Sequence, residues 1–507
     1  MAQKEYIITV ADPKIWDEIW DVLTIDGLSD NYIPKRAVEV ANERPFNDYC
    51  AHFYLTDNEA SQIRNDSRIQ AIELQADLQE NIKKDFAGTR TGLYDKNSWG
   101  GIQNNTMKNW GLLRCTNQEN PFSNSYSVTG NYNYNLDGTG VDIVLVDSGI
   151  EHNHPEFAVN PDGTGGSRVV DFDWSSLGVP GTPTSAEVNG YLGDSNGHGT
   201  HVAGIAAGNT QGWASGARIY SIRIFSGYDT KNGGNFLGAI SSDIAFDLTR
   251  AFHLQKVAAG GNVRPTICTN SWGYLRYYMN MTETYYRGTW YWKGSTDSMF
   301  GQIGDKHPTV VEYLDASVNN CSDAGVIMVG GAGNYKHKAD IPGGLDYNNK
   351  YRSENGNVES YYHRGMSPTR ASKMICVGAV EDGITERKAY YSETGPRIDI
   401  FAPGTSIMSS YNTGVPDSRN SNFYLKKLLG TSMACPQVTG VLACVLQLRP
   451  NMTTEQAKQF LIEHSIKDAL QVLGPPGYDN TSDLQGAGNR ILRMPFTNPV
   501  RGIMKRD

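Results

Sequence analysis

Three short segments of the chain carry a carboxylate, an imidazole and a hydroxyl that together could perform nucleophilic catalysis. Asp147 ends an apolar, β-branched run, His198 follows a glycine, and Ser432 lies two residues after Gly430. A serine hydroxyl becomes a nucleophile when a histidine removes its proton, and a carboxylate orients that histidine and stabilises its charged form. These residue types therefore predict acyl transfer or hydrolysis with Ser432 as the nucleophile.

The sequence around each residue indicates the element that must position it. The run 141–146 predicts a buried strand with the carboxylate at its carboxyl end, the edge at which open parallel sheets place their sites. His198 opens a predicted small-residue helix, and Ser432 falls in the first turn of an apolar helix, where Pro436 also fits. Free backbone N–H groups there suit a nucleophile whose attack creates an oxyanion. By itself, this serine also fits the cap of a core helix.

Four segments, in the order Asp, His, Asn, Ser, resemble the motifs of the subtilisin-like serine proteases (subtilases). The matching segments are Val146-Asp147-Ser148-Gly149-Ile150, His198-Gly199-Thr200-His201-Val202-Ala203-Gly204, Gly331-Ala332-Gly333-Asn334 and Gly430-Thr431-Ser432-Met433-Ala434-Cys435-Pro436. The order of Asp, His and Ser is that of subtilisin. The resemblance spans roughly residues 110–493, and it departs at Gln437, where the family usually has a histidine that is not catalytic.

The resemblance implies an α/β fold, layered around a mostly parallel sheet, and serine endopeptidase activity. It gives the catalytic roles to Asp147, His198 and Ser432, and it makes the Asn334 side-chain amide and the Ser432 backbone N–H the donors to the oxyanion. The alternative is an inactive binding or structural protein that keeps the subtilase fold. A Rossmann oxidoreductase is disfavoured, because the segment 331–333 lacks the third glycine at the required spacing.

By the same resemblance, an extended groove binds a protein or peptide substrate between two edges of the chain, as an added strand. The residues expected to form this groove are Gly233, Gly234, Ser271, Trp272, Gly273, Gly331, Ala332 and Gly333. The segment 274–292 contains eight Tyr and Trp residues. It is expected to cover the groove, to bind a partner or simply to pack against the protein.

Hydrolysis by these residues requires no cofactor, although the resemblance makes a structural calcium ion possible. Glu156 follows Asp147 in a segment that forms a surface turn in the family, and its acidic position can contribute to calcium binding there. Glu156 is therefore the candidate metal ligand. A turn residue that holds no metal is the other interpretation.

Residues 1–80 are predicted to form a separate small domain. Their apolar periodicity predicts the order β-α-β-β-α-β of a ferredoxin-like unit. This unit resembles the inhibitor-type propeptide of subtilases, so the chain's own propeptide is an expected partner; an unrelated α+β domain is the alternative. Residues 81–109 are rich in Gly, Asn, Thr and Lys and predict an exposed linker with a processing site. Residues 110–507 form the predicted catalytic domain.

Composition narrows the class of protein further. With 39% apolar residues, 20% charged residues and a net charge of −9, the chain is typical of globular proteins. It lacks the excess of basic residues that is typical of nucleic-acid-binding proteins. No apolar run reaches the ~18 residues of a membrane span, so neither nucleic acid nor a membrane is an expected partner.

The first residues lack the apolar core of a signal peptide, and the seven cysteines are scattered, without CxxC pairs. These features favour a cytoplasmic or virion-associated protein over a secreted one.

Overall fold

A computed structural model of the chain describes residues 3–10, 12–25, 36–42, 49–74, 88–97, 103–229, 234–261, 263–277, 281–292, 306–353, 359–472 and 484–496. The chain divides into two compact units, one formed by residues up to 86 and the other by residues 87–498.

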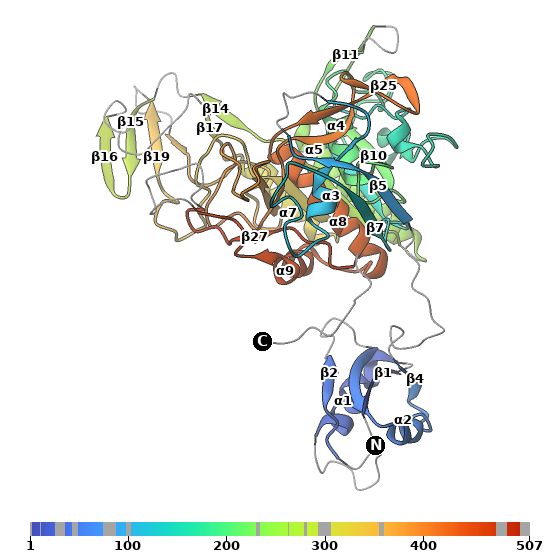
Figure 1. Ribbon diagram of the computed structural model, residues 1–507. Helices are drawn as coiled ribbons and strands as arrows, with labels where there is room; N and C mark the ends of the chain where they lie inside the picture. The colour runs from blue at the N-terminus through green and yellow to red at the C-terminus, as the bar shows by residue number, and fades with distance from the viewer. Residues whose placement is uncertain are drawn as a thin grey trace. The chain divides into compact units, whose positions relative to one another are not determined.

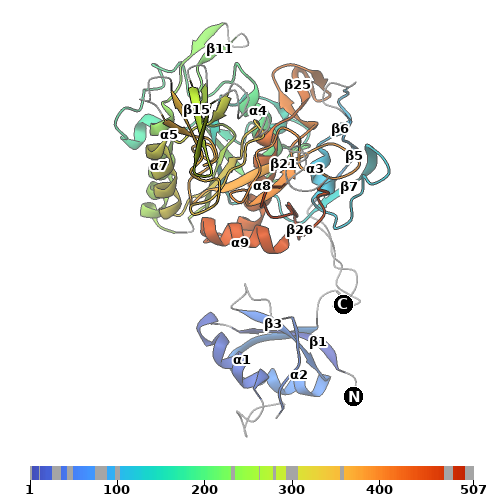
Figure 2. The ribbon, with the colours of Figure 1, turned by 90° about the vertical axis from the view of Figure 1, so that its left-hand side faces the viewer.

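The amino-terminal unit is a four-stranded antiparallel sheet with two helices (Figure 2). Its elements are β1 (Lys4–Val10), α1 (Trp16–Thr24), β2 (Val40–Asn42), β3 (Cys50–Leu55), α2 (Asp57–Ile63) and β4 (Ile69–Leu74), and the sheet order is β2-β3-β1-β4. Alternate residues of β1, including Ile8 and Val10, share one core with Ile19 and Leu23 of α1. The unit therefore has the β-α-β-β-α-β order that its apolar periodicity predicts.

The second unit is organised around a nine-stranded sheet. In spatial order its strands are β26 (Ile466–Lys467), β27 (Arg490–Ile491), β22 (Ile400–Pro403), β21 (Ile375–Val380), β18 (Ile327–Gly331), β13 (Thr266–Asn270), β8 (Asp142–Asp147), β10 (Arg218–Arg223) and β9 (Val169–Val170). Every neighbouring pair is parallel except β26 with β27. The predicted α/β fold around a mostly parallel sheet is confirmed.

Helices pack against both faces of this sheet (Figure 1). They are α3 (Trp110–Arg114), α4 (His198–Ala207), α5 (Ser242–Ala259), α7 (Glu312–Asp323), α8 (Thr431–Leu448) and α9 (Thr454–His464). Ile143 and Leu145 of β8 share a core with α4 and α8, whereas Val144 and Val146 share another with α5 and α7. Successive side chains of a strand point to opposite faces, so a strand covered on both sides must be apolar throughout.

The predicted exposed linker is wrong over residues 88–97 and 103–109, which belong to the second unit. β5 (Gly88–Asp95) pairs with β7 (Ser127–Tyr134) along its whole length and with β6 (Met107–Lys108). Arg90, Tyr94 and Lys96 of this segment are buried. Its polar, glycine-containing sequence forms a strand because β7 supplies a pairing partner, which the local composition does not reveal.

α8 is the central helix of the core, and its start differs from the predicted one. Gly430 precedes it with a φ of 142°, a conformation that favours glycine. Pro436 is the sixth residue of the helix, beyond the first turn, so its missing N–H leaves the Ser432 carbonyl without an intrahelical donor. Ser271 Oγ donates to that carbonyl instead, at 3.0 Å.

α8 is also the one helix, among the residues that the structure describes, with the length and hydropathy of a membrane span. Of its 18-residue window, 83% is buried inside the protein. Its apolar character therefore serves the core of this unit.

The aromatic segment 274–292 contributes strands to two small sheets, one of which projects to the left in Figure 1. β14 (Leu275–Tyr277) pairs with β17 (Lys306–Pro308), and β15 (Met281–Tyr286), β16 (Thr289–Trp292), β19 (Lys350–Ser353) and β20 (Glu359–Tyr361) form the projecting sheet. The Arg352 guanidinium lies 3.8 Å from the ring centre of Trp290, whereas Trp292 is 70% exposed. Trp290 thus packs within its own sheet, and Trp292 faces solvent.

Two further small sheets complete the unit. They are the hairpin of β11 (Gly227–Asp229) and β12 (Asn235–Leu237) and the sheet of β23 (Ile407–Tyr411), β24 (Val415–Asp417) and β25 (Asn420–Leu428).

Candidate active site

The predicted site residues gather at the carboxyl ends of three neighbouring strands, β18, β13 and β8. Asp147 ends β8, Ser271 directly follows β13, and Asn334 lies three residues beyond β18. Parallel strands end at the same edge of a sheet, so these residues are brought together. α4 and α8 begin at this edge, with His198 and Ser432 in their first turns.

Asp147 and His198 are joined by a hydrogen bond of 2.7 Å between Asp147 Oδ1 and His198 Nδ1. The Asp147 side chain is completely buried, and the His198 side chain is 30% exposed. Asp147 Oδ1 also accepts from the Ser148 N–H at 2.7 Å, which fixes the carboxylate. With Nδ1 held in this way, Nε2 is the ring nitrogen left for proton transfer.

Burial and Asp147 act on the pKa of His198 in opposite directions. Burial lowers the pKa, whereas the charge of Asp147 and its hydrogen bond raise it, and the net result is a pKa above the usual 6.5. Asp147 thereby favours the charged imidazolium, the form that His198 takes when it accepts a proton.

The start of α4 is held by Asp194, which the sequence argument missed. Its Oδ2 accepts from the Thr200 backbone N–H at 2.9 Å and from the Thr200 hydroxyl at 2.7 Å. Its Oδ1 accepts from the Ser148 hydroxyl at 3.0 Å, and that hydroxyl accepts from the Gly199 N–H at 2.8 Å. Asp194 therefore ties α4 to the end of β8. It lies four residues before the helix, whose N-cap residue is Gly197, so the usual position of a capping aspartate does not reveal it.

Ser432 is tied to the loop after β13 by two hydrogen bonds of 3.0 Å. Its hydroxyl donates to the Ser271 carbonyl, and Ser271 Oγ donates to the Ser432 carbonyl. The proton of the Ser432 hydroxyl is thus engaged by a backbone carbonyl in this rotamer. The hydroxyl must turn away from this carbonyl before a histidine can accept its proton, and catalytic hydrogen bonds often form only once substrate is bound.

Two nitrogen atoms with N–H groups converge beside Gly430. A Cβ placed on Gly430 would lie 3.4 Å from Asn334 Nδ2 and 3.5 Å from the Ser432 backbone nitrogen. Asn334 Oδ1 accepts from the Thr431 N–H at 2.8 Å and from the Thr431 hydroxyl at 3.1 Å, so Nδ2 is the free end of the amide. The Ser432 N–H is one of the four that a helix start leaves without an intrahelical partner. A negatively charged oxygen beside Gly430 could accept from both groups.

The predicted groove residues around β18 pass beside the start of α8. The Gly333 N–H donates to the Thr431 hydroxyl at 3.1 Å, and a Cβ on Gly331 would lie 3.1 Å from the Thr431 carbonyl oxygen. The Ala332 N–H donates to the Val377 carbonyl at 2.9 Å. The structure therefore brings the segment 331–333 next to the start of α8, the helix that carries Ser432.

The other predicted groove residues divide between two places. Trp272 stacks on Phe246 with ring centres 6.1 Å apart, and a Cβ on Gly273 would meet Met366 Cγ at 2.4 Å. Gly234 directly precedes β12, with a φ of 76°. Gly233 lies outside the described residues.

The structure does not place Glu156 to bind calcium, which corrects the expectation for this residue. Glu156 is fully buried, pairs with Arg419 and accepts from the Thr210 hydroxyl at 2.6 Å and from the Thr210 and Gln211 N–H groups at 2.9 and 3.0 Å. Burial raises the pKa of Glu156, but Arg419 and Thr210 outweigh it and hold the pKa well below the usual range. Arg419 neutralises the charge that would attract a cation.

Among the described residues, no group of three or more His, Cys, Asp or Glu side chains is arranged to hold a metal ion. A structural calcium ion therefore stays a prediction without an assigned ligand.

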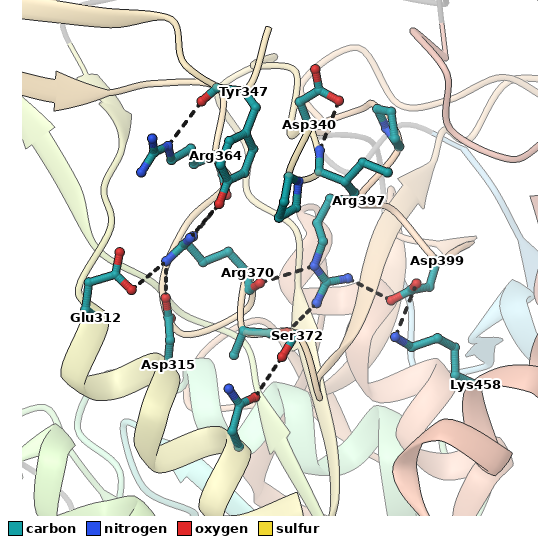
Figure 3. Close-up of a pocket in the computed structure, with 15 residues that line it drawn as sticks. Glu312, Asp315, Asp340, Tyr347, Arg364, Arg370, Ser372, Arg397, Asp399 and Lys458 are labelled. Carbon is teal, nitrogen blue, oxygen red and sulfur yellow. Dashed lines mark hydrogen bonds and ion pairs between the residues drawn. The ribbon is translucent and has the colours of Figure 1, made fainter. Parts of the chain in front are cut away.

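A charged pocket of about 380 Å³ shares no residue with this site (Figure 3). Arg397 donates from Nη2 to the carbonyls of Thr369, Ala371 and Met374 at 2.7–2.9 Å and from Nη1 to Asp399 Oδ2 at 2.9 Å. Nε also donates to the Arg370 carbonyl at 3.3 Å, so one guanidinium satisfies five oxygen atoms. This arrangement indicates a structural role for Arg397.

Replacing Arg397 by methionine should lower the free energy of unfolding by about 3–5 kcal/mol, because it leaves four carbonyls without their donor and Asp399 with only the longer ion pair to Lys458, at 3.7 Å. Urea unfolding of both proteins measures the change. Arg364→Met is the matched control from the same pocket: Arg364 stacks on Tyr361 and donates to Tyr347 O and Asn348, and it holds no buried carboxylate. Equal losses in the two variants would contradict the role of Arg397.

Comparison with known proteins shows relatives in fungi and bacteria. The subtilisin-like proteinase Spm1 of Pyricularia oryzae is 28% identical over 370 residues, which are 73% of this chain and 52% of that protein. The extracellular serine proteinase of Thermus sp. is 28% identical over 366 residues, 72% of this chain and 63% of that protein. A solved structure of a cold adapted subtilisin-like serine proteinase matches 76% of this chain and 97% of its own, at 23% identity and a TM-score of 0.47. The chain spans about half the length of the first of these relatives.

The relatives overturn the expectation of a cytoplasmic or virion-associated protein rather than a secreted one. One of them is named an extracellular serine proteinase. The expectation gave weight to the cysteines, but all seven are free and buried and behave as small apolar side chains. Their pattern therefore carries no information about the redox compartment.

A family model described as the subtilase family matches residues 138–488. This range includes Asp147, His198, Asn334 and Ser432, and it covers well over half of the 507 residues. The chain therefore belongs to the subtilase family.

Proposed function

We propose that this chain is a serine endopeptidase that hydrolyses peptide bonds in proteins through an acyl-enzyme. The observation that carries the proposal is the arrangement at one edge of the sheet: the 2.7 Å Asp147–His198 hydrogen bond forms at the edge where α8 begins with Ser432 in its first turn. Such an arrangement supplies a base, a group that orients the base, and a nucleophile.

In the proposed reaction, Ser432 Oγ attacks the carbonyl carbon of the substrate while its proton moves to His198 Nε2. The carbonyl oxygen becomes negatively charged and accepts hydrogen bonds from Asn334 Nδ2 and the Ser432 N–H. His198 then gives the proton to the leaving amine as the C–N bond breaks. Water attacks the acyl-enzyme by the same steps, which releases the acid and restores Ser432.

Digestion of an unfolded protein by the purified chain tests this function, with Ser432→Ala as the matched control. The wild type should produce peptides with new amino termini, and the variant should produce none above background. An inactive wild type that is folded, as judged by circular dichroism, would favour the alternative, a binding or structural protein that keeps the fold.

The acid limb of kcat/KM should have its midpoint above pH 6.5, because His198 must be neutral to accept a proton and Asp147 raises its pKa. In Asp147→Asn the burial that lowers this pKa remains and the charge that raises it is gone, so the midpoint should move to lower pH. Initial rates with an activated ester substrate measure both profiles. An unchanged midpoint in the variant would contradict the pairing.

We also propose that residues 1 to about 80 are a propeptide that inhibits the chain and that the chain removes. A tethered inhibitor has a high effective concentration, so even modest intrinsic affinity keeps it bound. The strand β5 begins at Gly88; Arg90 and Tyr94 within it and Lys96 directly after it are buried. Cleavage within residues 88–109 would cut this folded sheet, so we now expect it between residues 75 and 87.

Amino-terminal sequencing and intact mass of the purified protein test the processing. The wild type should yield a product that starts within residues 75–87, whereas Ser432→Ala should stay full length. The same cleavage in pure Ser432→Ala protein would show that another protease acts. A product that starts at Trp110 would contradict the revised boundary.

A further inference from the structure

The segment 391–393 runs beside both halves of the proposed oxyanion site. The Tyr391 hydroxyl accepts from the Gly430 N–H at 3.1 Å, directly before the nucleophile's helix. The Lys336 N–H donates to the Tyr391 carbonyl at 3.1 Å, two residues after Asn334. One short segment therefore contacts the two loops that supply the proposed donors.

Glu393, at the end of this segment, forms hydrogen bonds with the residues before and after Asn334. Its backbone N–H donates to the Gly333 carbonyl at 3.0 Å, and its side-chain Oε1 accepts from the Tyr335 N–H at 3.3 Å. Glu393 is 1% exposed, so these contacts are shielded from water.

The backbone at Gly333 depends on this packing. Gly333 has a φ of 121°, and a Cβ there would lie 2.7 Å from Glu393 Cγ. The loop therefore lies against the Glu393 side chain without room for another group. A change in how Glu393 holds the Tyr335 N–H would shift Asn334, which lies between the two contact points.

We propose that Glu393 is a positioning residue for the oxyanion donor. Its hydrogen bonds to the Gly333 carbonyl and the Tyr335 N–H hold Asn334 so that Nδ2 points toward the carbonyl oxygen of the substrate. The inference rests on the proposed protease function. Asn334 Oδ1 accepts from the Thr431 N–H and hydroxyl, so Thr431 holds the side-chain amide while Glu393 holds the backbone on either side of Asn334. An N–H donor that is already in position does not have to reorient when negative charge develops on the carbonyl oxygen of the substrate.

The charge state of Glu393 suits this role. Burial raises the pKa of Glu393 well above its usual range, although the Tyr335 N–H, the charge of Lys388 and the His337 backbone act in the opposite direction. The Lys388 ammonium donates to the carbonyls of Ala389 and Ser392. A raised pKa favours the neutral acid, and a neutral group behind Asn334 does not repel the oxyanion as a carboxylate would.

The proposal depends on the hydrogen bond that the Tyr335 N–H donates to Glu393 Oε1. The test therefore removes that acceptor while keeping the volume of the side chain nearly the same. Glu393→Met should lower kcat about 10-fold or more with little change in KM, because small misplacements of catalytic groups have large effects on rate. Glu393→Gln keeps an oxygen acceptor without charge and should restore kcat to within about 3-fold of wild type.

A double-mutant cycle separates positioning from a general structural effect. If Glu393 acts through Asn334, Glu393→Met should change kcat less than about 2-fold when Asn334 is already alanine. Equal fold losses in both backgrounds, or a Glu393→Gln variant as slow as Glu393→Met, would overturn the proposal. Thermal unfolding confirms that each variant is folded, and if Glu393→Met does not fold, Glu393→Ala, which also lacks the acceptor, takes its place in the cycle. A wild type without hydrolysis would instead refute the proposed function.

Discussion

Replacing Asp147 by asparagine should lower kcat for peptide hydrolysis about 10⁴-fold, with KM nearly unchanged. In the wild type the Asp147 carboxylate accepts a hydrogen bond from His198 Nδ1 at 2.7 Å, which leaves Nε2 free as the base. An asparagine amide can turn its NH₂ group toward Nδ1, and the imidazole would then keep its proton on Nε2, where it cannot accept one from Ser432. The stabilisation of the imidazolium by the negative charge is lost as well.

Steady-state kinetics on a peptide substrate measure this effect, with thermal unfolding as the test of folding. Asp315→Asn is a matched control: Asp315 is another buried carboxylate, paired with Arg370 in the pocket of Figure 3 and absent from the site. This control should change stability and leave kcat close to wild type. An Asp147→Asn variant that keeps most of its kcat would contradict the proposed role of Asp147.

Replacing Asn334 by alanine should lower kcat about 10²–10³-fold with little change in KM, the magnitude known for one such donor in subtilisin. The effect falls on kcat because the donor acts on an oxyanion that exists mainly in the transition state. Asn334 Oδ1 also accepts from Thr431, so the variant removes a hydrogen bond at the start of α8. Thr431→Val removes the hydroxyl part of that contact and the acceptor of the Gly333 N–H, but it keeps Asn334 Nδ2 and should cost far less in kcat. A raised KM at constant kcat in Asn334→Ala would assign Asn334 to substrate binding.

The parallel strands and the site segments could be predicted from the sequence for physical reasons. A strand covered on both faces is apolar over its covered length, so β8 shows as the apolar run Ile143-Val144-Leu145-Val146 between two aspartates. The nucleophile, base and donor each sit where a strand or helix ends, and glycines mark those places because the backbone there needs unusual conformations. Gly430, with its φ of 142°, is one of them.

Contacts between segments far apart in the chain could not be read in the same way. Glu156 is an acidic residue near two histidines, and only folding brings Arg419, 263 positions away, onto its carboxylate. β5 has the local composition of a linker, and its strand forms through pairing with β7. Glu393 gives no local signal either, because its partners are Gly333 and Tyr335.

The central claim, that His198 and Asp147 activate Ser432 as a nucleophile, is tested most directly by the site of covalent labelling. The measurement is the reaction of the purified chain with a fluorophosphonate, followed by peptide mass spectrometry to locate the phosphonyl group. We expect one group per chain, attached to Ser432, and loss of labelling in His198→Ala. Labelling of another residue, or an actively hydrolysing wild type with no group on Ser432, would contradict the claim.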